Sequence, residues 1–204
     1  MPETGNDADP RSTWRWVLLL RRATPGWMLR LFGGIASRVI MWRYRDSFDK
    51  NSPEYRQFHL WVHGTNADLY RDHVKAALDV LAAYAPVHMR WLRTRIDALL
   101  VNQLFMMTRT VTAADHRHRV LMLHPYTVWM VSPGQLALYL VAEATRLRLG
   151  RRFTQNRAGM IRADRRVLQE AVACARILPD NEALVVRWEK RLGAFNTRFP
   201  GAAA

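Results

Sequence analysis

The stretch from Ser132 to Gly150, SPGQLALYLVAEATRLRLG, is the part of this sequence whose conformation is most tightly constrained. Serine is a preferred N-cap, proline is favoured in the first turn of a helix, and glycine commonly follows the last turn. The residues between them have the spacing of an amphipathic helix. The sequence therefore predicts a helix bounded by Ser132 and Gly150, in which Glu143 stands between Ala142 and Arg146.

Periodicity and turn residues divide the rest of the chain into further elements. Alternating, aromatic or β-branched runs predict strands within residues 58–65, 97–105 and 118–125. Helical spacing predicts helices within residues 66–86, 87–96, 160–179 and 181–195. Pro86 and Pro179 are expected to end the first and third of these helices. The elements predict a predominantly helical α+β fold with a small sheet, in one domain over residues 51–204.

The first fifty residues differ from this domain in composition. Residues 1–13 are polar and contain proline, glycine and aspartate, which predicts a disordered tail. Residues 14–50 form a basic element that carries seven arginines and no acid up to residue 45. Residues 46–54 have the composition of a turn-rich linker. The apolar residues over about 27–44 predict an amphipathic N-terminal helix with a cationic side.

Three kinds of partner fit this basic element. An anionic membrane would attract each arginine by on the order of 1 kcal/mol while apolar side chains insert. Nucleic acid would use arginines on phosphates and tryptophans for stacking, but the sequence has no nucleic-acid fold signature. Because so apolar a helix needs a hydrophobic surface, the membrane, the body of the protein or a second copy is favoured. The candidate residues for membrane or anion binding are Arg30, Arg38, Arg45, Trp27 and Trp42.

Net charge and the single cysteine limit the class of protein. The formal charge of +14 comes almost wholly from arginine and favours an acidic protein, an anionic membrane or nucleic acid as partner. Cys174 alone allows no intrachain disulfide and is expected to be a small buried hydrophobe. The acidic, polar start does not fit a secretory signal, and arginines interrupt the apolar stretches. We expect a cytoplasmic protein, with the inner face of the membrane as the alternative.

Three segments share their order and pattern with one known family: ALDVLAAYAPVHMRWLRTRIDALLV, LALYLVAEATRLRL and ADRRVLQEAVACARILP. The first resembles the opening helix, proline break and strand of small bacterial zincin-type metallopeptidase domains. The second resembles their His-Glu-x-x-His helix, and the third resembles the helix that supplies a glutamate as third zinc ligand. The resemblance covers about residues 65–195 and implies a sheet packed against the zincin-like active-site helix.

The resemblance places Ala142 and Arg146 where the two zinc-binding histidines stand, Glu143 at the general base, and Asp164 at the ligand glutamate. Alanine has no donor atom, and arginine stays protonated under ordinary conditions. A catalytic zinc site typically needs three protein ligands, and this one would keep at most Asp164. We therefore expect a vestigial site with no metal, no other cofactor and no metal-assisted hydrolysis.

A fixed positive charge at position 146 has a physical consequence. Arg146 follows Glu143 by three residues on the same helix face and is expected to approach Asp164 from the neighbouring helix. Such an ion-pair cluster predicts that Arg146→Ala destabilises the fold more than Arg148→Ala. An ordinary surface pair of this spacing would instead contribute only about 0.2–0.5 kcal/mol.

The histidines suggest a second possible metal site. His59 and His63 share one face of a predicted strand, as do His116 and His118, and His124 lies nearby in sequence. No carboxylate or cysteine has ligand-like spacing to them, so scattered surface or capped histidines are the preferred interpretation. The chain also lacks a nucleophile elbow and a glycine-rich phosphate loop.

Together these features predict a non-catalytic, pseudo-peptidase domain that acts in protein interaction or regulation. A peripheral membrane protein that works through residues 14–45 is one alternative. A hydrolase with a site that the sequence does not reveal is the other. The sequence patterns do not determine the oligomeric state.

Overall fold

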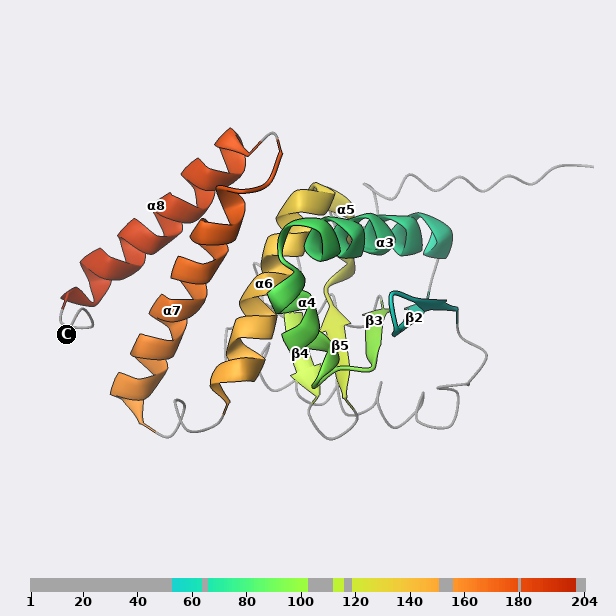
Figure 1. Cartoon of the computed structure of the whole chain (residues 1–204), viewed down its shortest axis with the longest axis horizontal. Helices are drawn as coiled ribbons and strands as arrows, with labels where there is room; N and C mark the ends of the chain where they lie inside the picture. Colours follow the sequence, from blue (N-terminus) through green and yellow to red (C-terminus); the bar gives the residue numbers. More distant parts are fainter. Residues whose placement is uncertain are drawn as a thin grey trace, which may run out of the picture.

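The computed structural model describes residues 53–63, 66–102, 112–115, 119–150, 156–179 and 181–200 of the 204-residue chain. Within these residues the fold is α+β and predominantly helical, as the sequence predicts (Figure 1). The strands are β1 (Glu54–Tyr55), β2 (Phe58–His63), β3 (Ala98–Asn102), β4 (Thr112–Asp115) and β5 (Val120–Leu123). The helices are α3 (Ala67–Tyr84), α4 (Pro86–Arg93), α5 (Pro125–Met130), α6 (Pro133–Leu149), α7 (Arg157–Ala175) and α8 (Glu182–Arg198).

The strands form one mixed sheet in the order β1-β2-β3-β5-β4. β2, β3 and β5 are parallel, and β1 and β4 pair antiparallel at the two edges. Parallel neighbours need a crossover connection, which α3 and α4 supply between β2 and β3. The runs 98–101 and 120–123 are apolar and buried throughout, as is usual for parallel strands covered on both faces.

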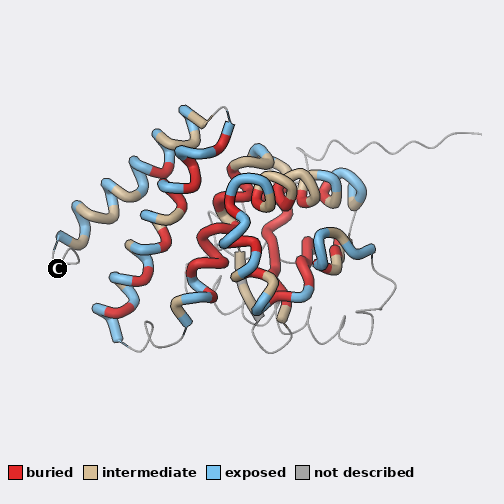
Figure 2. The backbone as a smooth tube through the Cα atoms, in the orientation of Figure 1, coloured by how far each residue is buried: buried red, intermediate tan, exposed pale blue. Residues whose placement is uncertain are grey.

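Helix α6 lies at the centre of the helical layer, where it contacts α3, α4, α7 and β4. Its two ends are as the sequence predicts, because the Ser132 hydroxyl accepts a hydrogen bond from the Gln135 N–H and Gly150 follows with φ 66°. Its sides differ from the amphipathic expectation. Within α6 only Arg146 and Arg148 are exposed, and Figure 2 shows the helix buried over most of its length. A helix surrounded by neighbours must be apolar nearly all round.

Helices α7 and α8 form a hairpin at one side of the molecule (Figure 1). α7 packs on α6, and α8 packs on α7. Trp188 is the one buried residue of α8, and its ring lies 5.6 Å from the Tyr139 ring of α6. The Arg191 guanidinium covers both rings, at 4.8 and 5.5 Å from their centres. α8 is thus held to the body mainly by one apolar edge.

Three short elements were not predicted. β1 falls at the end of the expected linker over 46–54, and β4 (TAAD) has little intrinsic strand preference, so sheet contacts determine both. α5 is too short to show a helical period. Pro86 does follow the end of α3 at Tyr84, but it also occupies the first turn of α4, where its missing N–H needs no partner.

The expected tail over residues 1–13 and the basic element over residues 14–50 lie outside the described residues. In the part of the chain that the structure describes, no helix is long and apolar enough to cross a membrane.

Candidate functional site

The carboxylate of Glu143 is buried where α6 faces the edge strand β4. The residue is 6% exposed, and two side chains donate to its Oε1. The Thr112 hydroxyl of β4 lies 2.6 Å away, and Nη1 of Arg146, one turn further along α6, lies 2.5 Å away. The Arg146 side chain is 49% exposed, so its guanidinium shields the carboxylate from solvent at the surface. Glu143 is thereby tied to both the helix and the sheet.

The residues at this site do not fit a zinc ion. Ala142 is buried beside Glu143 and brings only a methyl group. Arg146 brings a permanent cation, which already neutralises the one carboxylate of α6 at this place. Asp164 is exposed on α7, and none of the ion pairs among the described residues joins it to Arg146. Three converging donors are therefore not assembled.

The expected ion-pair cluster thus forms only in part. Glu143 and Arg146 pair as the sequence predicts, but among the described residues no ion pair joins Arg146 to Asp164. The physical reason is burial, because the desolvated Glu143 carboxylate gains more from a cation than the solvated Asp164 does. The candidate residues for membrane or anion binding all lie outside the described residues: Arg30, Arg38, Arg45, Trp27 and Trp42.

Arg146→Ala is expected to lower the free energy of unfolding by about 1–2 kcal/mol, because a buried carboxylate loses its countercharge. The estimate is below that for a fully buried pair, since Arg146 is half exposed. Thermal unfolding measures the change, as a fall in melting temperature of about 2–8 °C. Arg148 is a poor reference because its guanidinium stacks 4.0 Å above the Trp91 ring. Arg162→Ala, at an exposed position of α7, is the better control, and equal small shifts for Arg146 and Arg162 would contradict the prediction.

The described residues do not bring the histidines together into a metal site. His59 and His63 share one face of β2, and His124 is buried before α5. His116 and His118 lie outside the described residues. Within the described ranges, no group of three or more His, Cys, Asp or Glu side chains is placed to hold a metal ion.

A second polar cluster, which sequence reasoning missed, lies between α4 and α7. Cys174 Sγ is 3.7 Å from Nδ1 of His88, close enough for a weak hydrogen bond. Nε2 of His88 is 3.4 Å from Oε2 of Glu170, near enough for an ionic contact but without good hydrogen-bond geometry. The His88 ring meets Trp91 edge to face at 4.7 Å. The four-residue spacing of Glu170 and Cys174 places both on one face of α7, but no sequence signal links that face to α4.

The electrostatics of this cluster favour a neutral thiol at Cys174 and a neutral imidazole at His88. Burial raises the pKa of the Cys174 thiol to about 11, and the charge of Glu170 adds to the rise. Burial also lowers the pKa of His88 below its usual value, although Glu170 opposes this effect. A reactive cysteine needs a stabilised thiolate and access to substrate. This environment does not favour a thiolate at Cys174, which is buried as the sequence predicts.

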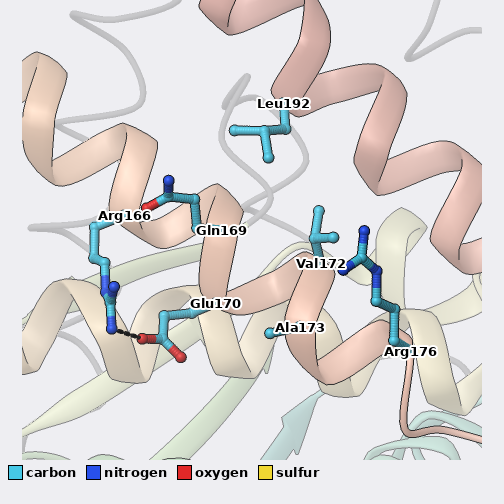
Figure 3. A pocket seen from close by; sticks show the side chains of 7 residues that line it. All are labelled: Arg166, Gln169, Glu170, Val172, Ala173, Arg176 and Leu192. Atoms are coloured by element: carbon cyan, nitrogen blue, oxygen red, sulfur yellow. Dashed lines mark ion pairs between the residues drawn. The ribbon is translucent and has the colours of Figure 1, made fainter. Parts of the chain in front are cut away.

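Glu170 connects the buried cluster to an open pocket on the hairpin, with a volume of about 460 Å³. Oε1 of Glu170 forms an ion pair with Nη2 of Arg166 at 2.5 Å, whereas Oε2 of Glu170 faces His88. Figure 3 shows the apolar side chains Val172 and Leu192 approaching each other from α7 and α8, with Arg166 and Arg176 toward opposite ends.

Comparisons of the chain with protein-family models, with curated proteins and with solved structures found no match. The resemblance to zincin-type domains therefore depends on the sequence pattern alone.

Proposed function

We propose that this chain is a non-catalytic, pseudo-peptidase domain that acts in protein interaction or regulation in the cytoplasm. The observation that carries the proposal is the pair at Glu143. At the position of a general base, the carboxylate is buried and held by Thr112 and by the guanidinium of Arg146. The cation comes from a position where the related peptidases would need a zinc ligand.

The surroundings of α6 support the same proposal. α6 meets the sheet through β4, which is the packing that the resemblance implies for the motif helix. Replacing a ligand by Ala142 and another by Arg146 removes the donors while keeping the charge balance of the buried carboxylate. In a site changed in this way, the buried pair stabilises the fold. Binding to a partner would then use the outer surface of the domain.

Metal analysis of the protein, purified without chelators and without metal-affinity resin, tests the proposal together with a general peptidase screen. We expect far less than one zinc per chain and no cleavage, because the donor set is incomplete. One zinc per chain with chelator-sensitive cleavage would refute the proposal. Cleavage without zinc would instead favour the alternative of a hydrolase with another site.

The membrane alternative depends on residues 14–45, which lie outside the described residues. Flotation with anionic liposomes, with and without those residues, tests it. Loss of flotation on their removal would establish peripheral binding, whether or not the domain also binds a protein.

A further inference from the structure

We propose that the pocket on the α7–α8 hairpin is a docking site for an acidic peptide segment of a partner protein. In this arrangement an aliphatic side chain of the peptide enters the pocket, and carboxylates of the peptide meet Arg166 and Arg176. The inference rests on the proposed interaction function and names its surface and the chemistry of its partner. Its first support is the shape and lining of the pocket (Figure 3).

The floor of the pocket is apolar. Val172 of α7 is buried and Leu192 of α8 is half-buried, and these two apolar side chains, here called the floor, line the pocket between the two helices. Ala173 is exposed and presents only a methyl group, which leaves room above the floor. Its volume of about 460 Å³ accommodates an aliphatic side chain with part of its backbone. Burying such a side chain contributes about 1.5–3 kcal/mol before the costs of association.

Cations flank this floor along α7. Arg166 and Arg176 are ten residues apart, which corresponds to about 15 Å along a helix. Both are largely exposed, at 58% and 63% of their side chains. Over residues 157–198 the sequence has nine Lys or Arg residues against five Asp or Glu residues. The hairpin as a whole therefore carries a net charge of +4 (nine minus five), which attracts a negatively charged segment.

Each of the two arginines already has a glutamate partner that an incoming carboxylate can replace. Arg166 pairs with Glu170 at 2.5 Å, and Arg176 pairs with Glu189 of α8 at 2.7 Å. The Arg176–Glu189 pair is exposed on both sides, and such pairs contribute about 0.2–1 kcal/mol, so exchanging it costs little. The Arg166–Glu170 pair costs more to exchange, because the Glu170 side chain is only 18% exposed. Release of Arg166 would leave Glu170 facing His88 alone, so the buried imidazole of His88 reports on the exchange.

Other occupants fit the pocket less well. A second copy would bring the same positive hairpin against itself, which like-charge repulsion opposes. Single-stranded nucleic acid binds through aromatic platforms, and the lining of this pocket has none. A membrane needs a projecting apolar surface, whereas this site is a hollow between two helices.

Fluorescence anisotropy of the full-length protein tests the inference. The probe is a labelled amphipathic peptide of alanine, leucine and glutamate, compared with a version that has glutamine in place of glutamate. We expect Ala173→Trp, which fills the space above the floor, to weaken binding at least about tenfold, or 1.4 kcal/mol. The matched control is Ala158→Trp, at an exposed alanine of α7 outside the pocket lining. Binding of the glutamate peptide should also shift the ring NMR signals of His88.

Charge variants complete the test, with circular dichroism to confirm folding. Arg166→Gln combined with Arg176→Gln should weaken binding more than Arg162→Gln combined with Arg157→Gln, at exposed positions outside the pocket lining. Equal losses for the two pairs, or for Ala158→Trp and Ala173→Trp, would overturn the inference in favour of diffuse charge attraction. Equal binding of the two peptides, or a dimer that Ala173→Trp dissociates, would also overturn it. None of these results touches the proposed function, which the metal analysis and the peptidase screen test separately.

Discussion

Ala142→His combined with Arg146→His is expected to raise the zinc affinity of this protein. The two imidazoles would stand one turn apart on α6, the spacing with which a helix holds zinc, beside the buried carboxylate of Glu143. Zinc at about one hundred times its Kd would stabilise the variant by about 2.7 kcal/mol, or about 5–10 °C in melting temperature. Thermal unfolding with and without zinc measures this.

A matched control separates the α6 position from the effect of any two histidines. Ala158 and Arg162 are the same residue types at the same spacing on α7, and both are exposed. Histidines there should bind zinc weakly, because no buried carboxylate lies beside them. If both histidine pairs respond alike, α6 holds no vestige of a metal site and the family resemblance loses its support.

Cys174 in the native protein is expected to react with a disulfide reagent such as DTNB at least about one hundred times more slowly than after unfolding. With its pKa at about 11, the thiol supplies very little thiolate near neutral pH. Burial beside His88 adds a steric barrier. Because the chain has a single cysteine, absorbance of the released reagent reports on this residue alone.

Unfolding in guanidinium serves as the reference for this measurement, since it exposes the thiol without changing the chain. Glu170→Gln should remove the smaller of the two causes of the raised pKa and leave the reaction slow. A native rate close to that of a free cysteine would show an activated thiolate. That outcome would make the Cys174, His88 and Glu170 arrangement a candidate active site and would favour the hydrolase alternative.

The features that the sequence predicted well depend on residues that are close to one another along the chain. Ser132 and Gly150 mark the ends of α6 because caps depend on neighbouring backbone groups. The pair of Glu143 and Arg146 was predictable because one helical turn joins them. The fold class followed from period and turn residues in the same way.

The features that the sequence missed depend on contacts between distant residues. Thr112 lies 31 positions before Glu143, and β4 becomes a strand only by pairing with β5. His88 meets Cys174 across 86 positions, with no spacing rule to suggest it. Arg146 was expected to reach Asp164 on the next helix, a choice that depends on burial and not on sequence distance. Tertiary packing decides all three.

Helix α8 has Trp188 as its one buried residue, so most of its side chains can change without disturbing the core. Substitutions at exposed helical positions usually change stability by less than about 0.5 kcal/mol. Substitutions can therefore accumulate on the outer side of α8 while the sheet and α6 keep their structure. The outer side of α8 is therefore a place where new recognition can evolve at little risk to folding.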